Sequence, residues 1–240
     1  MEQKEFTKEL DNKAKKMQII LTEKQLQDFY TYKRLLIEWN ERVNLTAITD
    51  DQDIILKHFI DSLTVYNLIK ENMTILDIGT GAGFPGIPLK IVKDKTNFVL
   101  MDSLNKRINF LNEVIKGLQL EKIQAIHGRA EEKAKEKAFR EKFDITVSRA
   151  VASLNVLLEY MLPFTKVGGY CICMKSSTID QELKEAEKAL EILGGKIEKI
   201  EEIKLPNSDI IRKNVIIQKI KQTPNQYPRK AGTPSKNPIM

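Results

Sequence analysis

The chain has 240 residues, of which 42% are hydrophobic and 30% charged, a composition that fits one globular domain with extensions better than two full domains. Lys and Arg outnumber Asp and Glu by 39 to 33, a net charge of +6, which suits an anionic partner and equally an ordinary soluble protein. No apolar stretch approaches the roughly 18 residues of a membrane span, and the N-terminus lacks the apolar core of a signal peptide. We therefore expect a cytoplasmic protein with no membrane association.

Cysteine and histidine are too sparse to suggest a metal site. Cys171 and Cys173 lie two apart in an apolar run, which places both on one face of a strand as small buried hydrophobes. His58 and His127 are far from the cysteines and from each other in sequence, whereas a structural zinc site needs clustered ligands. The sequence therefore predicts no metal and a reduced environment.

Residues 1–72 are expected to form an N-terminal helical extension. Thr22 and Gln25 have the spacing of a capping box, and apolar residues then recur at helical intervals over residues 26–40. A second amphipathic stripe runs over about residues 53–69. No strand pattern precedes residue 73.

From residue 73 onward, short β-rich runs alternate with helical stretches, which predicts a parallel sheet covered by helices on both faces. Strands are expected over residues 74–78, 97–101, 122–126, 143–147 and 170–174. A helix over about 179–193 precedes two strands, 197–204 and 211–220, which the turn 206–209 joins into an antiparallel hairpin. This α/β layout is that of the seven-stranded class I methyltransferase sheet, with residues 73–220 as its core.

Residues 221–240 form a basic tail that contains no acidic residue and is interrupted by prolines. Its positive residues are Lys221, Arg229, Lys230 and Lys236. A solvated, disordered end explains this composition as well as a segment that binds RNA does.

A glycine-rich turn follows the first predicted strand. Gly79, Gly81 and Gly83 stand at alternate positions, and a helix is expected to begin near Phe84 or Pro85. Glycine allows a positive φ and lets the backbone approach a ligand without an intervening Cβ. A strand, a tight turn and a helix start together indicate a nucleotide-binding loop.

Two cofactors fit this turn. Gly81 to Gly86 is a literal G-x-G-x-x-G, so an NAD-dependent oxidoreductase stays an alternative. S-adenosylmethionine is favoured because Asp77 precedes the first glycine inside the strand, the strand ends before Gly79, and a hairpin closes the sheet. This cofactor carries no pyrophosphate, but it has an ammonium group that Asp77 could hold directly or through water.

Further candidate residues follow the other predicted strands. Asp102 ends the second strand, where an acid can reach ribose hydroxyls, cap the next helix, or do both. Ala130 and Glu131 follow the third strand, where the loop would meet the adenine ring. Arg149 follows the fourth strand, beside the expected reaction centre, and could orient the cofactor's carboxylate or the substrate as a catalytic residue.

Several runs spread over nearly the whole chain carry a more specific signal through their order and spacing. They are WNERVNLTAI at 39–48, HFIDSL at 58–63, DIGTGAGFPGIP at 77–88, DSLNKR at 102–107, GRAE at 128–131, SRAVA at 148–152 and YPRKAGTP at 227–234. Together they resemble the small-subunit ribosomal RNA methyltransferases of the glucose-inhibited division protein B type.

The resemblance implies a class I methyltransferase fold with an added N-terminal helical part. It also implies methylation of guanine N7 in a loop of 16S ribosomal RNA. The cofactor contacts that it implies are Gly79, Phe84, Ala130, Glu131 and Arg149.

Methyl transfer to guanine N7 requires alignment of nucleophile, carbon and sulfur, and no general base, because N7 has a free lone pair and no proton to lose. The motifs typical of exocyclic-amine and pyrimidine C5 methylation are missing from the sequence. A ribose 2′-O-methyltransferase would need a lysine to handle the hydroxyl proton, and Lys175 keeps that alternative open. A non-catalytic RNA-binding assembly factor is the other alternative.

The expected partner is 16S ribosomal RNA or the small ribosomal subunit, bound by a monomer. Phosphate contacts are expected from basic residues, with Tyr227 or Phe84 as stacking surfaces. These basic residues are Lys106, Arg107, Arg129, Arg229 and Lys230, beside Arg149. We expect His58 and Asp61 to be helix-packing and capping residues, and Trp39 to lie in the core or an interface.

Overall fold

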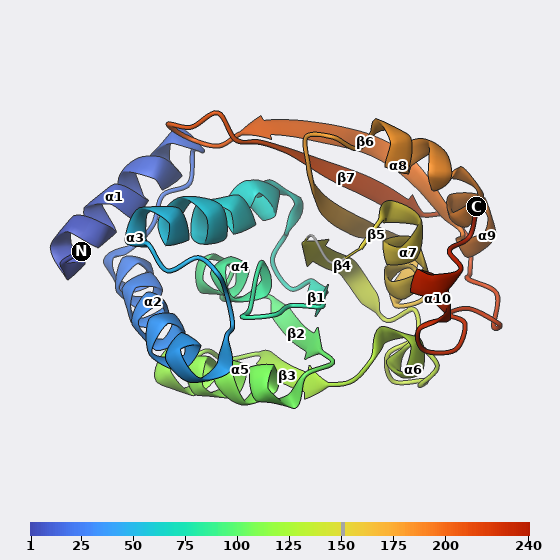
Figure 1. The fold of residues 1–240 in the computed structure, drawn as a ribbon, viewed down its shortest axis with the longest axis horizontal. Helices are drawn as coiled ribbons and strands as arrows, with labels where there is room; N and C mark the ends of the chain where they lie inside the picture. The colour runs from blue at the N-terminus through green and yellow to red at the C-terminus, as the bar shows by residue number, and fades with distance from the viewer. Residues whose placement is uncertain (150–151) are drawn as a thin grey trace.

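The structure, a computed structural model, describes residues 1–149 and 152–240. Its centre is a seven-stranded sheet in the order β3-β2-β1-β4-β5-β7-β6 (Figure 1). The strands are β1 (Thr74–Ile78), β2 (Asn97–Asp102), β3 (Ile123–His127), β4 (Phe143–Arg149), β5 (Thr165–Ser176), β6 (Gly195–Lys204) and β7 (Ile211–Lys219). β1 to β5 pair in parallel, whereas β7 runs antiparallel to both β5 and β6. The predicted class I methyltransferase sheet and its terminal hairpin are therefore confirmed.

Helices cover both faces of the sheet (Figure 1). The N-terminal ones are α1 (Gln3–Lys16), α2 (Glu23–Val43), α3 (Asp51–Asp53), the π-helix η1 (Ile54–Ile60) and the 3₁₀-helix η2 (Leu63–Leu68). The later ones are α4 (Gly86–Val92), α5 (Asn105–Gly117), α6 (Ala130–Lys133), α7 (Leu154–Met161), α8 (Asp180–Glu185), α9 (Glu187–Leu193) and α10 (Thr233–Lys236). Within the described residues, no helix is long and apolar enough to cross a membrane.

Alternation along the strands divides the core into two hydrophobic clusters, one on each face of the sheet. Ile75 of β1 packs in the cluster that contains α1, α2, α4 and α5, whereas Leu76 and Ile78 pack in the cluster of α7 and α9. Cys171 and Cys173 both lie buried in the second cluster, with their Sγ atoms 3.9 Å apart. The prediction that both thiols share one buried face is confirmed.

Some helix boundaries differ from prediction. The stretch expected as a single helix over 53–69 is helical through Leu68, but it is not one regular α-helix, because it passes from α3 into η1 and then η2. The carbonyl of Lys57 in η1 accepts a hydrogen bond from Arg149, and such an insertion from outside the helix accompanies a π-turn. The helix expected over 179–193 is interrupted at Ala186, and the helix after the glycine turn begins at Gly86.

The first helix, α1, has no counterpart in the predicted elements. Its Phe6, Leu10 and Ala14 recur every four residues and are fully buried, which is the helical spacing of an apolar stripe. The frequent charges between these positions conceal the stripe in the sequence.

The N-terminal helices pack directly against the glycine turn. Tyr32 of α2 is fully buried, and its hydroxyl donates a hydrogen bond to the carbonyl of Ala82. A Cβ on Gly83 would lie 2.8 Å from the Tyr32 hydroxyl and 2.6 Å from Ile87 Cγ1, so glycine at this position allows α2 to approach. The extension therefore helps to set the shape of the turn.

The C-terminal tail packs over α6 and α7 rather than extending into solvent. Arg140 donates hydrogen bonds to the carbonyls of Thr223, Pro224 and Tyr227. Ile239 is buried in the second cluster. The composition of the tail thus does not produce a solvated, disordered end.

Candidate active site

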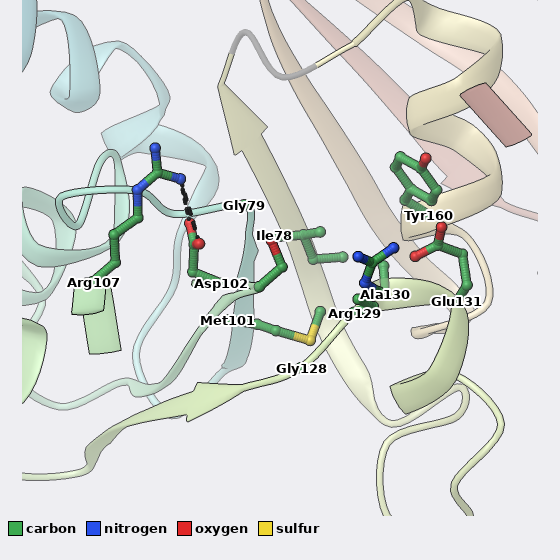
Figure 2. Close-up of a pocket in the computed structure, with 11 residues that line it drawn as sticks. Ile78, Gly79, Met101, Asp102, Arg107, Gly128, Arg129, Ala130, Glu131 and Tyr160 are labelled. Carbon is green, nitrogen blue, oxygen red and sulfur yellow. Dashed lines mark hydrogen bonds and ion pairs between the residues drawn. The ribbon is translucent and has the colours of Figure 1, made fainter. Parts of the chain in front are cut away.

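A cleft of about 340 Å³ opens where β1, β2 and β3 end (Figure 2). Ile78, Gly79 and Met101 form its floor. One wall carries Asp102 and Arg107, and the opposite wall carries Arg129, Ala130, Glu131 and Tyr160. Ser103 and Gly128 also line the cleft, and the Gly128 N–H donates to the Asp102 carbonyl. Open α/β sheets bind ligands at the carboxyl ends of their strands, near the point where the strand order reverses, which here lies at β1. The volume is that of a small-molecule site.

Asp102 joins the cleft wall to the glycine turn. Its Oδ2 accepts hydrogen bonds from the Gly81 N–H at 2.9 Å and from Arg107 Nη1 at 3.1 Å. Its Oδ1 accepts from the Leu104 N–H at 2.9 Å, and Leu104 itself occupies the N-cap of α5. The helix-cap alternative for Asp102 is therefore wrong. The carboxylate instead fixes the loop after β2 against the turn after β1.

Glycine is favoured at position 81 by the backbone conformation there and not by a lack of space for a side chain. Its φ is +62°, and a Cβ built on it would meet no atom within 4 Å. Residues other than glycine rarely adopt such a φ. The open side of Gly81 leaves its backbone free to approach a ligand.

Asp77 is fully buried and only half satisfied. Its Oδ2 accepts from the Thr80 hydroxyl at 2.7 Å and from the Gly86 N–H at 2.8 Å. Its Oδ1 has no hydrogen-bond partner among the described residues. Burial raises the pKa of Asp77 to about 7, since the loss of water outweighs the opposing effects of the hydrogen bonds from Thr80 and Gly86 and of the Arg149 charge. Asp77 itself lies outside the residues that line the cleft, one position before Ile78 of the cleft floor in β1.

Arg149 and Phe84 lie together, but outside the residues that line the cleft. Arg149 Nη1 donates to the Lys57 carbonyl at 3.0 Å and to Asp61 Oδ2 at 3.1 Å, and Nη2 lies 3.2 Å from His58 Nδ1. The His58 ring stacks on Phe84 with centroids 4.3 Å apart. The Arg149 guanidinium carbon lies 5.0 Å from the Phe84 ring centroid.

His58 and Asp61 therefore do more than the predicted packing and capping. Asp61 is buried and pairs with two arginines, Arg149 and Arg212, the latter through Nε at 2.8 Å. Burial and the nearby Arg149 lower the pKa of His58 to about 3. The neutral ring can accept from Arg149 at Nδ1 while Nε2 donates to the Thr46 hydroxyl at 2.9 Å. In the sequence, the run HFIDSL pointed to His58 and Asp61, but not to their partners Arg149 and Arg212, which are remote along the chain.

The expected RNA-contacting residues divide into exposed and occupied side chains. Arg129 and Lys230 are exposed. Lys106 is also exposed, although its Nζ donates to the Val43 carbonyl at 3.0 Å, and the half-exposed Arg107 pairs with Asp102. Arg229, in contrast, places its guanidinium on the buried carboxylate of Glu159. Trp39 packs against Phe110, in the core as predicted.

Lys175, the candidate for proton transfer from a ribose hydroxyl, is also occupied. Its Nζ donates to the Ala152 carbonyl at 2.7 Å and pairs with Glu182 at 2.7 Å. Ala150 and Val151, which belong to the run SRAVA, lie outside the described residues.

The cleft accommodates S-adenosylmethionine in both size and chemistry. Asp77 offers an unpartnered acceptor for its ammonium group, and the turn at Gly79 and Gly81 approaches without side chains. The fold is similar to a solved SAM-dependent methyltransferase from Aquifex aeolicus, with a TM-score of 0.52 and 20% identity over 70% of this chain and 93% of that chain. It is also similar to M. jannaschii TYW2 in complex with AdoMet, with a TM-score of 0.53 and 15% identity over 67% and 75% of the two chains.

These features define a class I, S-adenosylmethionine-dependent methyltransferase. The model of the family described as rRNA small subunit methyltransferase G matches residues 25–211. The chain is 57% identical to the Ribosomal RNA small subunit methyltransferase G of Acetivibrio thermocellus, over 91% of this chain and 90% of the relative. It is 54% identical to that of Desulforamulus reducens, over 98% and 99%. The chain belongs to the rRNA small subunit methyltransferase G family.

The raised pKa of Asp77 predicts proton release on cofactor binding. At pH 6 the carboxyl in the free protein is mostly protonated, since its pKa is about 7, and a bound ammonium group favours the carboxylate. S-adenosylmethionine should therefore release close to one proton at pH 6, and the number released should fall as the pH rises through the pKa of Asp77. Calorimetry in buffers of different ionisation enthalpy measures this number.

Asp77→Asn is the matched control for that measurement. The amide oxygen can still accept from Thr80 and Gly86, but the side chain no longer titrates. Binding to this variant should release no proton at pH 6. Equal proton release by both proteins would show that Asp77 is not the titrating group.

Proposed function

We propose that this protein transfers the methyl group of S-adenosylmethionine to N7 of a guanine in a loop of 16S ribosomal RNA. The observation that carries the cofactor assignment is the buried Asp77 carboxylate, which directly precedes the cleft residue Ile78 and has one oxygen without a partner among the described residues. The acceptor rests on membership of the rRNA small subunit methyltransferase G family over residues 25–211. We further propose that the protein acts as a monomer in the cytoplasm, on the RNA or on the small ribosomal subunit.

Different cleft residues would bind different parts of the cofactor. Asp77 would hold the ammonium group, directly or through water, and Gly79 and Gly81 would let the backbone approach. Asp102 would accept from the ribose hydroxyls while it keeps the Gly81 N–H and Arg107 as donors. These roles use charge-assisted hydrogen bonds, which are stronger than neutral ones.

The remaining cofactor contacts would come from the opposite wall and from the Arg149 cluster. Ala130 and Glu131 would flank the adenine ring, since both line the cleft. The turn continues through Gly83 to Phe84, which stacks on His58 beside Arg149. Phe84 would limit the space beside the reacting groups.

When bound, S-adenosylmethionine supplies an electrophilic methyl group on a sulfonium. The protein's part is to align the guanine with that group, because N7 has no proton to remove. We propose that Arg149 orients the cofactor's carboxylate or the guanine, since Asp61 and His58 hold its guanidinium in place. Lys175 is engaged by Glu182 and the Ala152 carbonyl, so no observation favours ribose 2′-O methylation as a second function.

RNA would be captured by basic side chains around the cleft. Lys106 and Lys230 are exposed, and Arg129 and Arg107 line the cleft itself. Such contacts bind phosphates and position the RNA without reading its sequence. Arg229 is left out of this surface because Glu159 occupies its guanidinium.

Methylation of small-subunit RNA by the purified protein tests the proposal. With labelled S-adenosylmethionine, one site in 16S RNA or in the small subunit should acquire a methyl group, and mass mapping should place it on guanine N7. Asp77→Asn should reduce this activity through weaker cofactor binding. Methylation of a ribose hydroxyl, or RNA binding without any methylated product, would contradict the proposal.

Removal of Lys106 and Lys230 tests the RNA surface. The double substitution to Ala should weaken RNA binding and lower the magnitude of the slope of log affinity against log salt by about 1.4 to 1.8, because each of the two lost phosphate contacts contributes roughly 0.7 to 0.9. Lys4→Ala with Lys8→Ala on α1 is the control, since it removes the same charge from a helix that lies far from α6, which carries the cleft residues Ala130 and Glu131 (Figure 1). Equal effects of the two pairs would rule out a specific surface at the cleft.

A further inference from the structure

A segment of the tail contacts the wall of the cleft. This segment, residues 229–236, is here called the strap. The N–H of Gly232 donates a 2.9 Å hydrogen bond to Oε1 of Glu131, and Glu131 is a cleft-lining residue (Figure 2). A residue of the cleft is thus held by a segment that lies 101 positions further along the chain.

An ion pair between the partly exposed Arg229 and the buried Glu159 fastens the strap to α7. The backbone N–H of Arg229 donates to Glu159 Oε1 at 2.8 Å, and its Nη2 donates to Oε2 at 2.7 Å, with Nε 3.0 Å from Oε1. The Glu159 side chain is only 1% exposed. Bidentate Arg–carboxylate pairs are strong and geometrically specific. Tyr160, the next residue of α7, lines the cleft.

The tail is also anchored on both sides of the strap. Before it, Arg140 holds the carbonyls of Thr223, Pro224 and Tyr227. After it, Asn155 Nδ2 donates to the Ile239 carbonyl at 3.3 Å, and Ile239 is buried. The strap is therefore held on α6 and α7, the two helices that carry Glu131 and Tyr160.

We propose that Glu159 and Arg229 are positioning residues for the cofactor cleft. The pair holds the strap so that the Gly232 N–H orients the Glu131 carboxylate before a ligand arrives. Without this contact, ordering the wall on binding would cost conformational entropy and reduce affinity. Cofactor binding in turn stabilises the strap, because coupling between two sites is reciprocal. The proposal rests on the cofactor site proposed above.

Cofactor affinity in the absence of RNA tests the pair. Arg229→Gln and Glu159→Gln should each raise the Kd for S-adenosylmethionine roughly tenfold, about 1.4 kcal/mol. The Kd of the double variant should not exceed the higher of the two single-variant Kd values, because the two side chains act as one unit. Lys236→Ala removes an exposed positive charge from the same strap and should leave the Kd within about twofold.

Hydrogen exchange on the unaltered protein gives an independent readout. S-adenosylmethionine should slow amide exchange in peptides that cover residues 229–236, and in Arg229→Gln this protection should be lost. In turnover, the KM for the cofactor should rise while kcat is retained. A purely structural role would lower the melting temperature but leave the Kd of the folded protein unchanged.

The outcomes separate this inference from the proposed function. If the unaltered protein does not bind S-adenosylmethionine, both proposals fail. If it binds the cofactor, but the Kd is the same in Arg229→Gln and exchange of the strap does not respond to the cofactor, the positioning role alone is overturned.

Discussion

The half-satisfied carboxylate of Asp77 is the constraint on which the site depends. Its Oδ2 joins strand, turn and helix by accepting from Thr80 and Gly86. A Cβ on Gly86 would lie 2.8 Å from that oxygen, so only glycine permits this contact. The other oxygen is buried and has no partner among the residues that the structure describes, at a cost of roughly 1–3 kcal/mol. Such a local violation is expected at a functional site, where a ligand offsets it.

The turn that surrounds Asp77 is also fixed from both sides. Asp102 holds Gly81 from the end of β2, and Tyr32 holds Ala82 from α2. The N-terminal helices therefore contribute to the cofactor site as well as to the core. Through η1 they also supply His58 and Asp61, which hold Arg149. The sheet provides the strand ends, and the added helices restrict how the residues there can move.

The seven strands and the glycine turn were predictable because their signals are local. Alternation, turn residues and helical stripes act over a few residues, so strand positions agree to within a few residues at most ends. The π-turn of η1, the pairing of Asp61 with Arg212 and the contact of Gly232 with Glu131 were not predicted. Asp61 and Arg212 are 151 positions apart, and no periodic pattern reports a contact at that separation. The charged tail also looked solvated because its carboxylate partner, Glu159, lies in a different element.

The most direct test of this account compares S-adenosylhomocysteine with an analogue in which a hydroxyl replaces its amino group. The unaltered protein should prefer the amino form by about tenfold or more, since a charge-assisted hydrogen bond contributes roughly 1.5–3 kcal/mol. In Asp77→Asn that preference should disappear, while the hydroxyl analogue binds both proteins similarly. An equal preference for the amino form in both proteins would contradict the role of Asp77, and with it the assignment of the cofactor's orientation in the cleft.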